Sequence, residues 1–205
     1  MIETRNLFEV PIFITTLTGI TDKFKINDLL EREFIENKRG DEWQVTQTNP
    51  NLQEKKKFKG FCKAVSDVVY TVSSDIMEYD KNYSVDITAM WGNKQKKGTG
   101  FHLHAHHNNI FSGVFYPDGG EEFPGIIFSR PFDTAFAPTI KNYNIHNWQT
   151  YELNACQKDC LLVFPSWLAH EVPVNHSDKD RMSISFNVML RGRYGYPNSN
   201  QSSAF

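Results

Sequence analysis

The sequence is poor in cysteine, in net charge and in long apolar runs. Its three cysteines, Cys62, Cys156 and Cys160, are an odd and sparse set without the second pair of a typical zinc site, so we expect reduced thiols. Lys and Arg number 22 against 24 Asp and Glu, which gives no reason to expect a nucleic-acid or membrane surface. No apolar run approaches the length of a membrane-spanning helix.

The N-terminus also lacks the uninterrupted apolar core of a signal peptide. Glu3, Arg5 and Glu9 lie where that core would have to be. We therefore expect a cytoplasmic protein.

With 205 residues, the chain is long enough for one sizeable core and short for two, so we expect a single domain. Apolar residues recur at helical spacing over 22–38 and more clearly over 52–78, where the lysines lie off the apolar stripe on an expected solvated face. The expected division is a helical preface over 1–80, a jelly roll over 82–191 and a loosely ordered tail over 192–205.

From residue 82 onward the apolar period changes to two, in short runs rich in Val, Ile, Phe and Tyr. No helical pattern separates these runs, so a mainly β fold with N-terminal helices is expected, as a cupin-like double-stranded β-helix, or jelly roll. The expected strands lie near 84–91, 100–106, 111–116, 125–128, 150–154, 160–164, 170–174 and 182–190.

Histidine, by contrast, is concentrated: four of the seven histidines lie in FHLHAHH, residues 101–107. Successive side chains of a strand point to opposite faces, so His102, His104 and His106 would share one face. Neutral imidazole is a good ligand for iron, zinc, copper or nickel, and two histidines two residues apart can chelate one ion. The pattern indicates a metal site, against the alternative of a solvated polar cluster.

A third ligand is available on a distant strand. His170 follows the apolar run LVFPSWLA, in a position from which it can re-enter the same pocket. His104, His106 and His170 would form a facial set that leaves coordination positions open for substrate or oxygen. His102 with His104 is an alternative register that the spacing leaves open.

An arginine on the last long strand suggests an anion pocket. Ser183 lies two residues after Arg181 and therefore on the same face of the strand. A buried guanidinium needs an anionic partner, and its planar fork fits a carboxylate, to which the Ser183 hydroxyl can add a hydrogen bond. These residues predict a dicarboxylate pocket. The alternative is an exposed Arg181 paired with Asp178 or Asp180.

Together these motifs resemble those of the Fe(II)- and 2-oxoglutarate-dependent oxygenases, in particular a small branch with a prolyl-hydroxylase-like jelly roll from marine phages and bacteria. Members of that branch have H-x-H, then SGVYY, then F-P-S-W-L-x-H, then R-x-S-x-S-F-N. This chain has HAHH from His104, SGVFY ending at Tyr116, FPSWLAH ending at His170 and RMSISFN from Arg181. The opening LFEVPIF is also similar, so the resemblance covers most of the chain.

The resemblance implies a hydroxylating dioxygenase with Fe(II) and 2-oxoglutarate as cofactors. Its partners would be dioxygen and a small-molecule or peptide substrate, and it would release succinate and carbon dioxide. The implied metal ligands are His104, His106 and His170, and the implied cosubstrate residues are Arg181, Ser183 and Tyr116.

The chain departs from the family pattern at one metal ligand. The wider superfamily has a carboxylate where His106 stands, so a three-histidine set leaves the site one negative charge poorer. His107 and Asn109 also replace the Pro and Ser that are usual in the branch. Glu121 or Glu122 could supply an acid only if their hairpin turn folded back over the metal.

Two other functions share parts of this pattern. A cupin-like three-histidine metalloprotein that does not use 2-oxoglutarate would share the jelly roll, and Gly98 precedes His104 as in the cupin pattern. That interpretation assigns no function to Arg181. A structural or interaction protein with a decayed site is the third alternative.

Aromatic residues near the expected site have two alternative roles. Trp167 is a candidate wall of the metal pocket or an ordinary core residue. Phe136, Tyr143 and Trp148, in the long polar segment 132–149, are candidates for a substrate lid, since long loops beside a rigid barrel often carry specificity.

Overall fold

A computed structural model of the chain describes most of its residues. Cys156 and the lid candidates Phe136, Tyr143 and Trp148 lie outside the described residues, so their predicted roles stay predictions. The described residues are 9–39, 45–80, 82–131, 139, 141–142, 149–154, 157–196 and 198–205.

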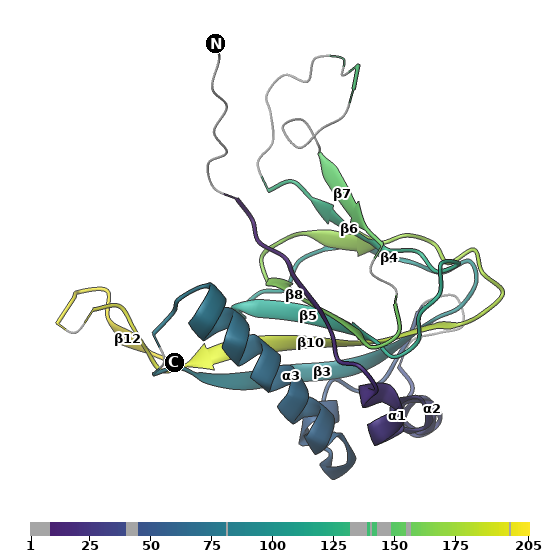
Figure 1. Ribbon diagram of the computed structural model, residues 1–205, viewed down its shortest axis with the longest axis horizontal. Coiled ribbons are helices and arrows are strands. Elements are labelled where there is room, and N and C mark those ends of the chain that lie inside the picture. The colour runs from purple at the N-terminus through teal and green to yellow at the C-terminus, as the bar shows by residue number, and fades with distance from the viewer. Residues whose placement is uncertain are drawn as a thin grey trace.

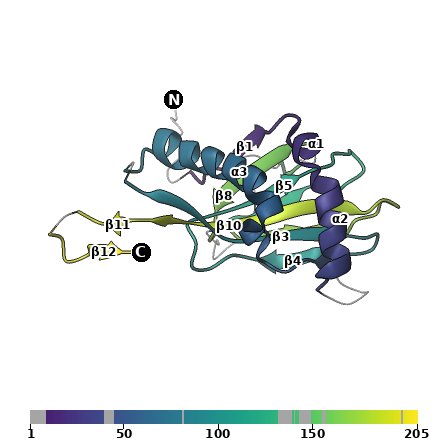
Figure 2. The same ribbon diagram turned by 90° about the horizontal axis from the view of Figure 1, so that it is seen from below.

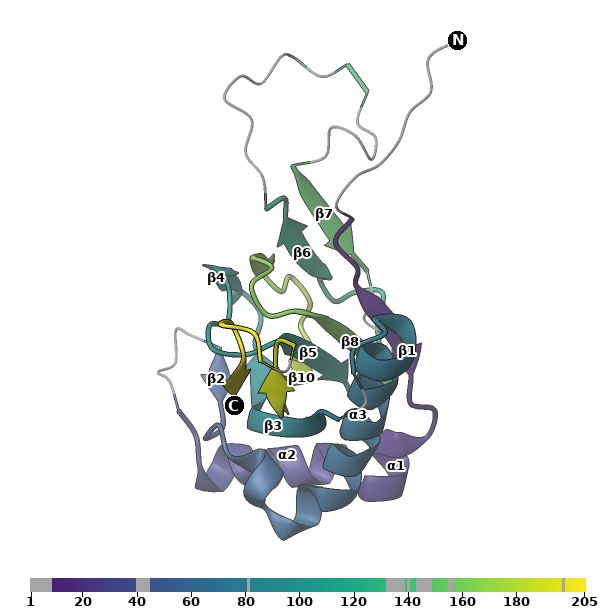
Figure 3. The same ribbon diagram turned by 90° about the vertical axis from the view of Figure 1, so that its left-hand side faces the viewer.

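Two antiparallel sheets lie one above the other, and the helices cover the outer face of the larger sheet (Figure 1 and Figure 3). The larger sheet has the strand order β1-β8-β5-β10-β3-β2, and the smaller has β4-β9-β6-β7. The larger sheet consists of β1 (Phe13–Thr16), β2 (Thr46–Gln47), β3 (Ser84–Gln95), β5 (Phe111–Tyr116), β8 (Cys160–Pro165) and β10 (Arg181–Arg191). The smaller consists of β4 (Phe101–His104), β6 (Ile126–Ser129), β7 (Thr150–Leu153) and β9 (His170–Val172).

All eight expected strands are present, which confirms the prediction of a mainly β fold with N-terminal helices. The strand expected over 100–106 ends earlier, at His104, so His106 lies in the loop that follows β4. The short edge strands β1 and β2 were not predicted.

The helices lie across one face of the larger sheet (Figure 2). The expected helix over 22–38 is two helices, because Lys25 adopts a left-handed conformation with φ 52° between them. The expected helix over 52–78 begins with short 3₁₀ turns and ends in a π-helical turn. These elements are α1 (Ile20–Phe24), α2 (Ile26–Glu36), η1 (Leu52–Glu54), η2 (Lys56–Phe58), α3 (Lys59–Thr71) and η3 (Val72–Ile76). None of the described helices is long and apolar enough to cross a membrane.

Side chains that alternate along the larger sheet form two separate cores. On β8, Leu161 and Val163 belong to the core under the helices, whereas Leu162 and Phe164 belong to the core between the sheets. The same period of two sends Ile184 and the following apolar residues of β10 toward the helices. The remaining face of β10, which begins with the side chain of Arg181, therefore faces the smaller sheet.

A buried carboxylate forms ion pairs within the helical layer. Glu33 of α2 is 1% exposed and binds the ammonium groups of Lys55 and Lys57, the latter at 2.8 Å. These two lysines thus make ion pairs rather than lying on the purely solvated face that was expected. Burial raises the pKa of Glu33, but the hydrogen bonds and charges of the two lysines outweigh this effect, so the pKa is lowered.

The C-terminal end differs from the loosely ordered tail that was expected. β11 (Arg193–Tyr194) pairs with β12 (Ser203–Ala204) in a projecting hairpin (Figure 1). The ring of Tyr194 lies 4.9 Å from that of Tyr83 and 5.1 Å from that of Phe205, centroid to centroid. These aromatic contacts provide apolar packing for a segment whose composition is mostly polar. Elsewhere, Cys62 is a free thiol.

The Glu33 ion pairs generate a prediction about acid stability. Glu33→Gln should lower the free energy of unfolding by about 1–3 kcal/mol at neutral pH, because two ammonium groups lose their anion. A carboxylate with a lowered pKa stabilises the fold above its unfolded pKa, and this contribution disappears as the pH falls through the folded pKa. The difference between the variant and the wild type should therefore shrink on acidification. Urea denaturation at a series of pH values measures it, and Glu36→Gln, on the exposed side of α2, is the matched control.

Candidate active site

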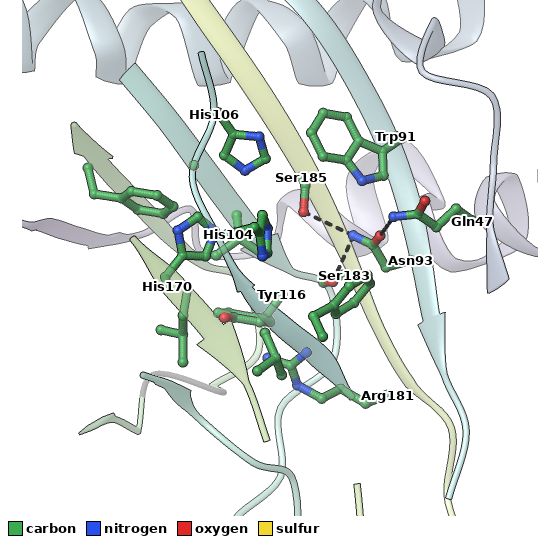
Figure 4. Close-up of a pocket in the computed structure, with 16 residues that line it drawn as sticks. Gln47, Trp91, Asn93, His104, His106, Tyr116, His170, Arg181, Ser183 and Ser185 are labelled. Carbon is green, nitrogen blue, oxygen red and sulfur yellow. Dashed lines mark hydrogen bonds between the residues drawn. The ribbon is translucent and has the colours of Figure 1, made fainter. Parts of the chain in front are cut away.

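One pocket between the two sheets contains both clusters that the sequence singled out (Figure 4). His104 is the last residue of β4, His106 follows it by two residues, and His170 is the first residue of β9. β4 and β9 are antiparallel neighbours in which His104 and His170 lie directly opposite each other. Residues far apart in the sequence thus meet because two strands of the smaller sheet pair.

The three imidazoles converge on one point. One ring nitrogen of each lies within 4.8 Å of those of the other two. The ring centroids are 4.4 Å apart for His104 and His170, 5.2 Å for His104 and His106, and 5.3 Å for His106 and His170. Among the described residues no carboxylate joins this group. The donor set is therefore three imidazoles, which suits iron, zinc, copper or nickel.

Backbone carbonyls orient two of these rings. His104 Nδ1 lies 2.7 Å from the carbonyl oxygen of His102, and His170 Nδ1 lies 3.0 Å from that of Leu168. A carbonyl oxygen only accepts, so Nδ1 carries the proton in both rings and Nε2 keeps its lone pair. Such partners commonly orient histidine ligands. Both rings are thus held in the tautomer that presents Nε2 to a metal ion.

The pocket keeps His106 and His170 uncharged. Burial, followed by the nearby His104 and His107, lowers the pKa of His106 to about 4. Burial also lowers the pKa of His170 to about 4, although its hydrogen bond to the Leu168 carbonyl acts in the opposite direction. Both rings are therefore neutral at pH 7, and neutral imidazole is the form that binds a metal ion.

The loop that carries His106 is tied to the FPSWLAH segment through Ser166. The His106 amide donates to the Ser166 carbonyl at 2.9 Å, and the Ser166 amide donates to the Ile110 carbonyl at 3.1 Å. The Ser166 hydroxyl is fully buried and lies 2.8 Å from that of Ser112. The two motifs that supply the histidines are therefore joined before any metal binds.

Arg181 and Ser183 lie in the same pocket, each 3% exposed. The guanidinium carbon of Arg181 lies 4.8 Å from the centre of the Tyr116 ring, and Nη1 donates to Gln95 Oε1 at 3.2 Å. The alternative of an exposed Arg181 is wrong. Asp178, its suggested partner, instead binds Lys97 at 2.6 Å. The arrangement leaves a buried cation beside a hydroxyl, which is suited to a carboxylate.

The contribution of β3 and β2 to this pocket was not predicted from the sequence. Trp91 and Asn93 of β3 and Gln47 of β2 line it, and the Trp91 ring lies 5.8 Å from that of His106. On β3 the alternation Trp91-x-Asn93 opposite Ser185 and Ser183 of β10 was the available signal. The signal becomes visible only when the register of the two strands is known.

Several suggested residues lie elsewhere. The His102 side chain is exposed and outside the metal-binding group, so the alternative register is not the one that the structure assembles. Trp167 is 55% exposed and is neither a wall of the pocket nor a core residue. Glu121 is exposed, and Glu122 binds Lys179 at 2.7 Å on the surface, so their turn does not fold over the histidines.

Comparison with protein families decides the class. Residues 89–187 match the family described as "Putative 2OG-Fe(II) oxygenase". This segment belongs to the 2OG-Fe(II) oxygenases. It contains the three histidines, Arg181 and Ser183, and every other residue that lines the pocket except Gln47. The predictions of an oxygenase and of 2-oxoglutarate and Fe(II) as its cofactors are confirmed.

Several solved structures share the fold of this chain. A Pseudomonas putida prolyl-4-hydroxylase is 12% identical with a TM-score of 0.61, covering 89% of this chain and 94% of its own. HygX from Streptomyces hygroscopicus, solved with nickel, 2-oxoglutarate and hygromycin B, is 12% identical with a TM-score of 0.63, covering 88% and 83%. The carbocyclase SnoK from nogalamycin biosynthesis is 10% identical with a TM-score of 0.64, covering 94% and 84%. The prediction of a jelly roll is thus confirmed. A search of curated proteins returns no match.

The grouping of the histidines predicts which one the metal requires. His170→Ala should weaken Fe(II) binding by at least about 10-fold, because losing even an outer partner of a ligand costs that much. His102→Ala should bind Fe(II) like the wild type, because its exposed side chain lies outside the group. Anaerobic equilibrium dialysis with a colorimetric iron assay measures both. Equal losses in the two variants would contradict this grouping.

Proposed function

We propose that the chain is an Fe(II)- and 2-oxoglutarate-dependent dioxygenase that hydroxylates a small-molecule or peptide substrate and releases succinate and carbon dioxide. The observation that carries this proposal is that one pocket holds converging imidazoles and a buried Arg181 beside Ser183. The family assignment supplies the cofactors. The proposal adds the residues and the reaction.

His104, His106 and His170 are the proposed metal ligands. Their ring nitrogens are close enough to share one ion, and the carbonyl-bound Nδ1 atoms of His104 and His170 direct Nε2 toward it. Three ligands on one side of an ion leave the other positions for the cosubstrate and dioxygen. The three histidines would hold Fe(II), which would supply the activation of dioxygen, coupled to the oxidative decarboxylation of 2-oxoglutarate.

Arg181 and Ser183 are the proposed partners of the C5 carboxylate of 2-oxoglutarate. The guanidinium offers paired N–H donors and Ser183 a hydroxyl donor, both removed from competing water. Tyr116, 1% exposed, packs its ring face against the guanidinium. These residues bind and orient the cosubstrate, and the buried walls of the pocket exclude water from the reacting centre.

The three-histidine donor set is also that of cupin-like metalloproteins, which form the second candidate. Compared with a His-carboxylate-His set, it lowers the negative charge around the metal by one. The buried Arg181 beside the Ser183 hydroxyl favours the oxygenase, because these donors suit the C5 carboxylate of 2-oxoglutarate, which a cupin-like site of this kind does not use. The single-domain division of the chain and its cytoplasmic location remain predictions.

Anaerobic spectroscopy tests the cosubstrate assignment. Fe(II)-loaded wild-type protein should develop the visible absorption band that accompanies chelation of ferrous iron by a 2-oxo acid. Arg181→Ala should weaken 2-oxoglutarate binding by about 10–100-fold, because a charge-assisted pair is lost. Lys97→Ala, which removes an exposed cation from the same end of the fold, is the control and should leave the titration unchanged. An iron-loaded wild-type protein without the band would favour the cupin-like candidate.

A further inference from the structure

Two buried amide side chains lie behind the proposed cosubstrate residues. In the ladder between β3 and β10, Gln95 is directly opposite Arg181 and Asn93 is directly opposite Ser183. Gln95 is fully buried and Asn93 is 2% exposed. Neither belongs to the histidine or arginine motifs. Buried amides need partners for all of their polar atoms, so their hydrogen bonds show which way each amide is turned.

Backbone carbonyl groups bind the side-chain nitrogen of Gln95. Nε2 donates to the carbonyl oxygen of Thr99 at 2.7 Å and to that of Pro173 at 2.8 Å. Carbonyls accept only from the nitrogen, so the opposite atom, Oε1, is turned toward Arg181, whose Nη1 donates to it at 3.2 Å. The loops after β3 and β9 thus determine the direction in which Gln95 holds the guanidinium.

The Asn93 amide is held from the other side. Its Oδ1 accepts from Gln47 Nε2 at 2.8 Å, which directs Nδ2 toward β10. Nδ2 donates to Ser185 Oγ at 2.9 Å and lies 3.4 Å from Ser183 Oγ. An amide N–H only donates, so both serine oxygens act as acceptors toward Asn93. Each hydroxyl proton is then left to be donated into the pocket, which both serines line.

We propose that Asn93 and Gln95 are positioning residues for the cosubstrate: they turn Arg181, Ser183 and Ser185 into a wall of hydrogen-bond donors that selects a 2-oxo acid with a second carboxylate. A carboxylate offers only acceptors, so a wall oriented in advance binds it without reorganisation. The inference rests on the proposed function, because it places 2-oxoglutarate in this pocket.

Pyruvate separates positioning from general stability. It has the 2-oxo acid group that chelates a metal but lacks the second carboxylate, so the donor wall contributes nothing to its binding. The experiment titrates Fe(II)-loaded protein anaerobically with 2-oxoglutarate and with pyruvate, and follows the visible band. Gln95→Met and Asn93→Leu keep approximately the size of each side chain and remove its hydrogen bonds.

Each variant should weaken 2-oxoglutarate binding by about 10-fold, which is the effect of one lost hydrogen bond to a charged group, and should leave pyruvate binding unchanged. Equal losses for both acids would overturn the inference, since the amides would then only maintain the fold. Unchanged affinity for 2-oxoglutarate would overturn it as well. If Asn93 acts through the serines, Asn93→Leu should have little effect in a Ser183→Ala/Ser185→Ala background.

Thr48→Val is the matched structural control. Thr48 is 1% exposed, and its hydroxyl accepts from the Gly92 amide of β3 at 3.0 Å. Its methyl group lies over Gly92 together with Leu30, on the helix side of the sheet. The substitution removes a buried hydrogen bond next to the same strand, so it should lower stability without altering the preference for 2-oxoglutarate over pyruvate.

Failure of this inference can be distinguished from failure of the proposed function. In the wild type, the proposed function requires a strong preference for 2-oxoglutarate over pyruvate, and Arg181→Ala must remove it. A wild type without that preference would overturn the cosubstrate assignment and this inference together. A wild type with the preference, in which the Gln95 and Asn93 variants retain it, would overturn this inference alone.

Discussion

The alternation of side chains across the β3–β10 ladder is the constraint on which the rest of the structure depends. One face of β10 is apolar and is buried under the helices, where Ile184, Phe186 and Val188 are fully buried. Because successive side chains take opposite faces, this burial also determines the other face. A slip of one residue would place Arg181 under the helices. The apolar packing of the helical layer therefore positions the polar wall of the pocket.

The histidine end of the pocket depends on a different kind of contact. His104 and His170 belong to short strands of the smaller sheet, and backbone carbonyls two residues before each ring determine its tautomer. His106 lies outside any strand and is positioned by its amide bond to Ser166. The site thus combines strand pairing with one loop that a buried serine holds in place. Such support limits the reorganisation that metal binding requires.

Charge divides the pocket into two parts. Three imidazoles lie at one end, and the Arg181 guanidinium lies at the other. In the proposed complex, the two negative charges of 2-oxoglutarate would meet the three positive charges of a divalent metal and Arg181. The missing carboxylate ligand therefore leaves the loaded site more positive than a His-carboxylate-His site would be. This difference is a property of His106 itself.

Some elements of the fold and of the site could be predicted from the sequence, and others could not. The eight expected strands, the histidine cluster and the Arg181-x-Ser183 pattern were all accessible, because period-two alternation and ligand spacing are local properties. The break between the two first helices at Lys25 could not be predicted, because a left-handed residue within an apolar helical pattern leaves no periodic signal. The hydrogen-bond partners of Arg181 and Ser183 could not be predicted either. Gln95 lies 86 residues from Arg181 along the chain, and Asn93 lies 90 residues from Ser183.

By itself, the sequence determined the period of each segment, the residue types that can bind a metal and a carboxylate, and the family to which residues 89–187 belong. Only the tertiary structure decided which histidines converge, that His102 does not, and how the Asn93 and Gln95 amides are turned. The physical reason is that spacing along a strand specifies a face, whereas the distance between two faces is set by strand register and by the packing of one sheet on the other.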